Sequence, residues 1–209
     1  MWQQKLGLGL SDSFRLSVPA QLQTFARVGF DAFFSDDSDP EQRALPAEEL
    51  ARRGRDCGLL YQSIHAPFGK AADLWHEDAA AGDAAVQELL DSLERCRRAE
   101  VPLLVLHAFI GFDEHTPNER GIERFGRVVQ AAQGTGVRLA AAAPVGAGNP
   151  AGLTGFVRGA LAQFVRAGDT VLASGMIGSE QGLYPMPHLP APVGIAALHA
   201  GIRAATLPD

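Results

Sequence analysis

The chain has 209 residues, of which 46% are hydrophobic and 20% are charged, as is usual for a soluble globular protein. A formal net charge of −6, without a long run of Lys or Arg, argues against nucleic-acid binding through a general basic surface. No stretch of about 18 uninterrupted apolar residues occurs, so we expect no membrane span.

The two cysteines, Cys57 and Cys96, lack CxxC spacing, and we therefore predict neither a zinc knuckle nor a disulfide framework. Free thiols of this kind fit a reducing, cytoplasmic location. The first residues, Met1–Lys5, lack the apolar run of a signal peptide, which agrees with that expectation.

The first two-thirds of the chain alternates between short apolar runs and amphipathic stretches. The predicted strands are Leu6–Leu10, Phe30–Ser35, Leu60–His65, Leu103–His107 and Val137–Ala143. The predicted helices are Val18–Val28, Pro46–Cys57, Ala80–Ala99 and Asn118–Ala132. A regular strand–helix alternation with short links predicts a parallel α/β sheet. It fits the front part of a (β/α)8 barrel, with a doubly wound sheet as the alternative.

The pattern changes after Ala143. A Gly/Pro-rich loop over Pro144–Pro150 is followed by a predicted helix over Leu153–Val165 and a predicted strand over Asp169–Met176. The Pro-rich segment Tyr184–Pro192 is predicted to be irregular, and a last helix is predicted over Pro192–Ala204. We therefore predict two units, residues 1–143 and residues 144–209.

Two of the predicted strands end at a histidine, His65 and His107. Side chains at the carboxyl ends of barrel strands point into the active-site mouth, and neutral imidazole is a common metal ligand. We predict that both residues act in catalysis, as metal ligands or as groups that orient a small molecule. The alternative is two strand-end histidines that bond to nearby backbone.

Two polar segments follow predicted strands and could add side chains to the same mouth. The first is Asp36-Asp37-Ser38-Asp39, where Asp36 is predicted to bind substrate; the alternative is a solvated acidic loop that caps a helix. The second follows the third strand, where Trp75 and Glu77 are predicted to bind substrate in a covering loop; the alternative is a plain surface loop.

The front segment resembles the xylose-isomerase-like barrel superfamily, in particular its small sugar phosphate isomerases and epimerases. The resemblance covers about residues 5–140 and rests on the segments Phe30–Ser35, Ile64–Phe68, Leu74-Trp75 and Val105–His107. It implies a (β/α)8 architecture with a divalent-metal site (Mn, Mg or Zn) at the carboxyl face. In the apurinic endonuclease branch the histidines that end strands three and four bind zinc, and in the isomerase branch they line the substrate pocket; these positions fall on His65 and His107.

Two departures accompany this resemblance. Relatives usually place a metal-binding Glu at the end of strand five, where this chain has the alanines of Val137–Ala143. The tail, from about residue 145 to 203, is similar instead to the first domain of 2-keto-3-deoxygalactonate kinases, which belong to the actin-like ATPase group. That resemblance rests on the segments Val171–Ser179, Gly182–Tyr184 and Pro187–Pro192.

These resemblances imply two functions, and the exposed surfaces of an open barrel front suggest a third. The first is metal-assisted proton transfer on a small sugar or sugar phosphate by an isomerase/epimerase-like protein whose reading frame is fused or truncated. The second is a sugar-acid kinase fragment, for which ATP would be the cofactor. The third is a non-catalytic product that binds a partner or forms a homo-oligomer through exposed sheet edges and apolar helix faces.

Overall fold

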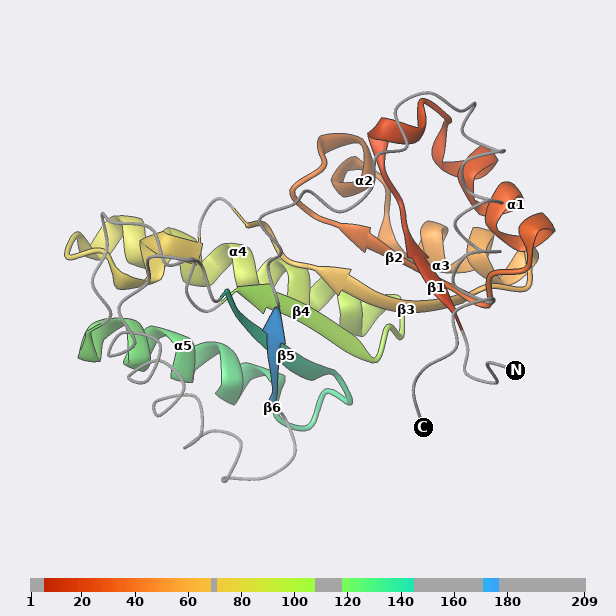
Figure 1. The fold of residues 1–209 in the computed structure, drawn as a ribbon. Coiled ribbons are helices and arrows are strands. Elements are labelled where there is room, and N and C mark those ends of the chain that lie inside the picture. The colour runs from red at the N-terminus through yellow and green to blue at the C-terminus, as the bar shows by residue number, and fades with distance from the viewer. Residues whose placement is uncertain (1–5, 69–70, 108–117, 145–170, 177–209) are drawn as a thin grey trace, which may run out of the picture.

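The computed structural model describes residues 6–68, 71–107, 118–144 and 171–176, with the backbone alone described at 71–72, 141–144 and 171–176. These residues contain one six-stranded parallel sheet in the order β1-β2-β3-β4-β5-β6 (Figure 1). Its strands are β1 (Gly7–Gly9), β2 (Ala32–Asp36), β3 (Leu60–His65), β4 (Leu103–His107), β5 (Arg138–Pro144) and β6 (Val171–Met176). The predicted parallel α/β fold is confirmed.

Helices connect successive strands and pack in a layer along the sheet. They are α1 (Val18–Val28), α2 (Pro40–Ala44), α3 (Ala47–Asp56), α4 (Ala79–Arg98) and α5 (Glu119–Ala132), with short 3₁₀ turns η1 (Asp12–Phe14) and η2 (Ala71–Trp75). Helix α3 contacts β3, α4 contacts β3 and β4, and α5 contacts β5, while α4 also packs against both α3 and α5 (Figure 1). Helix α2 and the 3₁₀ turns were not among the predicted elements.

Side-chain caps fix where three of these helices begin. The carboxylate of Asp39 accepts from the N–H groups of Glu41 and Gln42 at the start of α2, and Asp78 does the same for Ala80 and Ala81 in α4. The Asn118 side chain accepts from Gly121 N–H in α5. Such caps satisfy backbone donors that have no partner inside the helix.

The core lies between the sheet and the helix layer. Its largest fully buried side chains include Phe25 of α1, Phe33 of β2 and Phe125 of α5. The Phe33 ring stacks on Tyr61 of β3 at a centroid distance of 4.4 Å, and it lies so close to Gly54 of α3 that a side chain there would overlap the ring. The strands are held to the helices by this apolar layer.

The described strands form an open sheet. Strand β5 pairs with β4 and β6, and β1 pairs with β2, so the segment Val137–Ala143 does not close onto Leu6–Leu10. Strand β6 comes from the predicted second unit, residues 144–209, and it extends the sheet of the first. The helices predicted over 153–165 and 192–204 lie outside the described residues. Within those residues, no helix has the length and apolar character that crossing a bilayer requires.

Register places a row of side chains on the sheet face opposite the helix layer. Asp36 pairs with His65, His65 with Val105, and Val105 with Ala140, so these residues share one face. Since side chains alternate along a strand, His107 lies on the same face as Val105. Parallel strands end at the same edge of a sheet, which brings Asp36, His65 and His107 to one edge.

Candidate active site at the carboxyl edge of the sheet

The imidazoles of His65 and His107 meet at the carboxyl ends of β3 and β4. The Nε2 atoms of the two rings lie 3.1 Å apart, and the ring centroids are 4.9 Å apart. His107 is 4% exposed, whereas His65 is half-buried. The structure therefore brings together the two residues that the sequence singles out, and they come from neighbouring strands.

Hydrogen bonding assigns the protons of this pair. The Nδ1 atom of His65 lies 3.0 Å from the Ala66 carbonyl oxygen, which is purely an acceptor, so His65 carries its proton on Nδ1. In the neutral ring, Nε2 of His65 then holds a lone pair, and Nε2–H of His107 donates to it. This arrangement leaves Nδ1 of His107 as an acceptor, and that atom is buried without a partner among the described residues.

The environment keeps His107 neutral at physiological pH. Burial, and to a lesser extent the neighbouring His65, lower the pKa of His107 to about 4. The negative charge of Asp36 acts in the opposite direction and raises the pKa of His107. Burial has the larger effect, because the hydration free energy that an imidazolium loses here exceeds its attraction to the carboxylate of Asp36.

Asp36 belongs to the same site. It ends β2 directly beside His65 in the sheet register, and its carboxylate accepts from Ser38 N–H at 2.7 Å. Its negative charge also raises the pKa of His107, the second imidazole of the pair. Of the three predicted substrate-binding residues, Asp36 is the one that the structure places with the histidine pair.

The alternative interpretation of the acidic segment, a solvated loop that caps a helix, is right for Asp39 and wrong for Asp37. Asp39 caps α2, as described above. Asp37 is 2% exposed, and its carboxylate accepts from Ser92 Oγ at 2.6 Å and from Arg95 Nε at 3.2 Å. A buried carboxylate needs such partners because it has lost its hydration. In the sequence, one sign of a buried polar contact was Ser92, a polar residue within the apolar stripe of the predicted helix Ala80–Ala99.

Trp75 and Glu77 are placed differently from Asp36. The Trp75 ring is buried in the core against α5, where a side chain added at Gly121 would overlap it. Glu77 is exposed, and its carbonyl oxygen accepts from Arg120 Nη1 at 3.1 Å. The segment that carries both is fixed by Arg124, whose guanidinium donates to the carbonyl oxygens of Leu74, His76 and Asp78.

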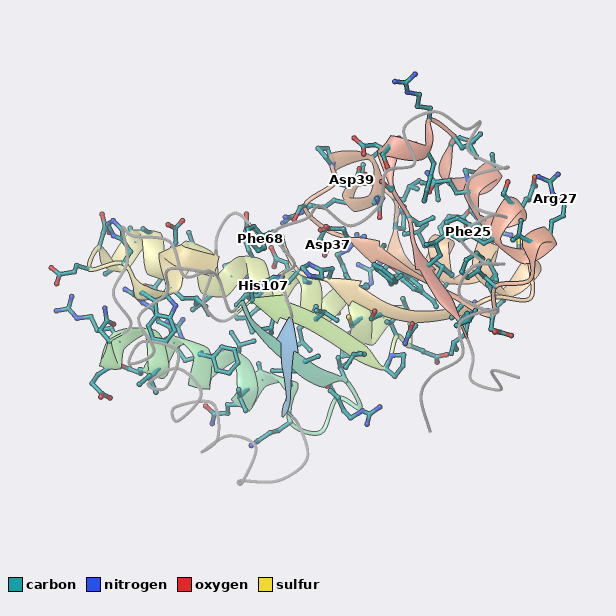
Figure 2. All side chains as sticks on the ribbon, in the orientation of Figure 1. Phe25, Arg27, Asp37, Asp39, Phe68 and His107 are labelled. Carbon is teal, nitrogen blue, oxygen red and sulfur yellow. The ribbon has the colours of Figure 1, made fainter. Side chains whose placement is uncertain are left out.

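Phe68 is a neighbour of the pair to which the sequence assigned no role. Its ring meets the His107 ring edge-on, with centroids 4.6 Å apart and planes at 80° (Figure 2).

The donor chemistry of the pair fits two positions of a metal site. The Nδ1–H bond from His65 to a backbone carbonyl is the usual way to present Nε2 to a metal ion. Two nitrogen ligands of a tetrahedral zinc ion lie about 3.3 Å apart, close to the 3.1 Å between the two Nε2 atoms. Within the described residues, however, no cluster of three or more His, Cys, Asp or Glu side chains is arranged to hold a metal. The imidazoles thus supply part of a ligand set.

Comparisons with solved structures identify the same fold. A D-psicose 3-epimerase from Clostridium cellulolyticum H10, solved with D-tagatose, aligns at a TM-score of 0.62 and 17% identity, covering 82% of this chain and 63% of that one. An Escherichia coli 3-keto-D-glucoside 4-epimerase aligns at 0.64 and 14%, covering 83% and 68%. A Thermus thermophilus protein soaked with ZnCl₂ aligns at 0.58 and 19%, covering 82% and 65%.

The chain spans about two thirds of the length of these solved structures. No curated protein matches its sequence. The family model described as xylose isomerase-like TIM barrel matches residues 22–144, more than half of the chain. That match does not extend through residues 145–203, where the likeness to sugar-acid kinases stays a prediction. Family match and sheet topology agree, and this chain belongs to the xylose isomerase-like TIM barrel family.

Proposed function

We propose that the chain is an isomerase or epimerase that transfers a proton at the carbon beside the carbonyl of a small sugar or sugar phosphate. The observation that carries the proposal is the convergence of His65 Nε2 and His107 Nε2, 3.1 Å apart at the carboxyl edge of the sheet. Solved structures of this fold include epimerases of D-psicose and of a 3-keto-D-glucoside, which supports a sugar as substrate.

His65 would act as the base. Its Nε2 lone pair would take the proton from carbon, and the electron pair of that C–H bond would move onto the carbonyl oxygen to give an enediolate. The Nδ1–H bond to Ala66 and the carboxylate of Asp36 would stabilise the resulting imidazolium. Delivery of a solvent proton to the other face of that carbon, with loss of the proton on His65 to solvent, gives the epimer, and transfer of the proton from His65 to the neighbouring carbon gives the isomer.

His107 would act as a neutral hydrogen-bond donor. With a pKa of about 4 it remains uncharged at pH 7, so its Nε2–H is available to the substrate's carbonyl oxygen once a substrate separates the two rings. A neutral imidazole can stabilise developing negative charge on oxygen without being a strong acid itself.

A divalent metal ion, when bound, would supply further charge stabilisation at the substrate oxygens. In that metal-bound form the Nε2 atoms of His65 and His107 would be ligands and would no longer serve as base and hydrogen-bond donor, and Asp36 is the acidic side chain near them. Zinc suits imidazole ligands better than magnesium does. ATP would be the cofactor under the kinase alternative. Among the residues that the structure describes, no contact or side-chain arrangement favours that alternative.

Proton exchange with solvent tests the proposal. D-fructose, D-psicose and D-tagatose are incubated with the protein in D₂O, with and without Zn²⁺ or Mn²⁺, and ¹H NMR follows loss of the carbon-bound proton beside the carbonyl. We expect exchange in the wild type and a loss of at least about 100-fold in His65→Gln and His107→Gln. The matched control is His76→Asn, whose side-chain oxygen can still accept from Asp78 N–H as His76 Nδ1 does.

Absence of exchange with every sugar and metal would refute the function. Exchange that persists in both His65→Gln and His107→Gln would refute the site while leaving the reaction standing. Equal losses in His76→Asn and in the two site variants would point to general misfolding rather than to lost catalysis.

A further inference from the structure

Phe68 combines an exposed apolar ring with a polar site. It is 39% exposed, and with Phe34 and Leu60 it forms the set of large hydrophobic side chains that the described part of the chain leaves exposed. The other two lie within strands β2 and β3, whereas Phe68 lies in the segment after β3 and contacts His107 (Figure 2). Single exposed apolar side chains are common on protein surfaces, so it is the edge-on contact with His107, rather than the exposure alone, that sets Phe68 apart.

A hydrogen bond from the neighbouring loop holds Phe68 in this position. Its backbone N–H donates to Ser38 Oγ at 3.0 Å, which links the segment after β3 to the segment after β2. Ser38 is itself fixed, because its N–H donates to Asp36 Oδ1 at 2.7 Å. Asp37 N–H completes the connection by donating to the carbonyl oxygen of His65 at 2.8 Å. The ring is therefore tied to the same loop that carries the Asp36 carboxylate.

We propose that Phe68 is a specificity-determining residue whose ring forms the apolar wall of the site and packs against the C–H face of a sugar, with Ser38 as its positioning residue. The proposal rests on the proposed function and names the part of the substrate that Phe68 would recognise. A sugar carries hydroxyl groups at its edges and C–H bonds on its faces. Asp36 and the imidazoles can form hydrogen bonds with the hydroxyl groups. An exposed phenyl ring can pack against the C–H face.

Substitutions at Phe68 separate recognition from chemistry. In Phe68→Ala we expect the KM for the accepted ketohexose, and its Kd by isothermal titration, to rise about tenfold, equivalent to about 1.4 kcal/mol. The kcat should stay within about threefold, because no reacting group is removed. Phe68→Trp should keep the Kd within about twofold of wild type, since an aromatic wall is retained.

Two further variants complete the design. Ser38→Ala should raise the Kd by a smaller factor, about threefold, because the ring stays but loses the bond that positions it. Leu60→Ala is the matched control: Leu60 is also exposed, but it begins the strand that His65 ends and so lies about 16 Å away along β3. Its Kd should equal that of the wild type.

The outcomes distinguish this proposal from the proposed function. Equal loss of affinity in Phe68→Ala and Phe68→Trp, equal loss in Phe68→Ala and Leu60→Ala, or an unchanged Kd in Phe68→Ala would overturn the role of Phe68 while turnover stands. A wild type that binds ketohexoses without turning them over would remove the proposed function, and the Kd pattern would still decide this role. Failure of the wild type to bind any of the three ketohexoses would overturn both.

Discussion

Arg95 of helix α4 and Asp37 at the end of β2 form an ion pair in which the carboxylate is fully buried. The Nε–H of Arg95 donates to Asp37 Oδ1 at 3.2 Å, while the rest of the guanidinium donates to the carbonyl oxygens of Gln42, Arg43 and Leu45 at the end of α2. One side chain thus fixes the loop beside the active site and supplies donors to carbonyl groups that helix α2 leaves unpaired.

Removal of Asp37 should be costly for stability. A buried ion pair that loses one partner leaves an uncompensated charge, for which a loss of about 3 kcal/mol is typical. We expect Asp37→Ala to lower the free energy of unfolding by about that amount in urea denaturation. The control is Asp83→Ala, which removes the exposed pair Arg127–Asp83 with its 2.6 Å contact and should cost less than about 1 kcal/mol. Equal effects of the two variants would contradict a special role for the buried pair.

His107 should make stability depend on pH between about 6.5 and 4. Its pKa is lowered in the folded protein to about 4, chiefly by burial, and lies near 6.5 in the unfolded chain. In this window the unfolded state binds more protons, so the free energy of unfolding is highest above pH 6.5 and falls as the pH approaches 4. Urea unfolding of the metal-free protein should show about 2 kcal/mol lost between pH 7 and pH 4.5 through this group.

The variant His107→Gln isolates that contribution, because every carboxylate remains in it. The difference between wild type and variant in the free energy of unfolding should therefore shrink as the pH falls through the window. Parallel pH profiles for the two proteins would show that the folded state does not keep His107 neutral.

Much of the fold could be predicted because the signals are local. The strands over Leu60–His65 and Leu103–His107 are apolar runs with clear ends, and the long helix between them repeats its apolar residues every three and four positions. Helix α2 escaped prediction because its five residues, Pro40–Ala44, depend on a partner elsewhere in the chain. The guanidinium of Arg95 donates to the carbonyl oxygens of Arg43 and Leu45 from 52 and 50 positions away.

The difference between local signals and contacts from distant parts of the chain also applies to the active site. That His65 and His107 meet follows from two facts available in the sequence: each ends a strand, and adjacent parallel strands end at one edge. The sequence offers one sign of the buried Asp37, the polar Ser92 within an apolar helix stripe, but not the pairing itself, because Ser92 and Arg95 approach Asp37 from another element of the chain. The contact of Phe68 with His107 depends in turn on Ser38, which belongs to a different loop.

Gly121 should resist substitution although it lies in a helix. Alanine normally stabilises a helix relative to glycine by about 1 kcal/mol. Here a Cβ at position 121 would lie 2.0 Å from Trp75 Cε3, so the indole ring or helix α5 must shift. We expect Gly121→Ala to lower the free energy of unfolding by about 2 kcal/mol, as overpacked cores do.

A double variant tests whether Gly121→Ala acts through the overlap with Trp75. If the overlap with Trp75 is the cause, Gly121→Ala in a Trp75→Leu background should cost much less than in the wild type. A stabilising Gly121→Ala, or additive losses in the double variant, would show that Trp75 does not pack against this face of α5.

Metal preference provides a test of which side chains supply the ligands. Imidazole nitrogen favours zinc, whereas magnesium requires several carboxylate or water oxygens. Since His65 and His107 present two nitrogens and Asp36 is the neighbouring carboxylate, Zn²⁺ should raise the melting temperature more than Mg²⁺ at equal concentration. The increase should vanish in His65→Gln and in His107→Gln. It should persist in Cys57→Ser, which removes a half-buried free thiol that could bind zinc adventitiously. Equal stabilisation by Mg²⁺ would mean that carboxylates, rather than this imidazole pair, dominate the site.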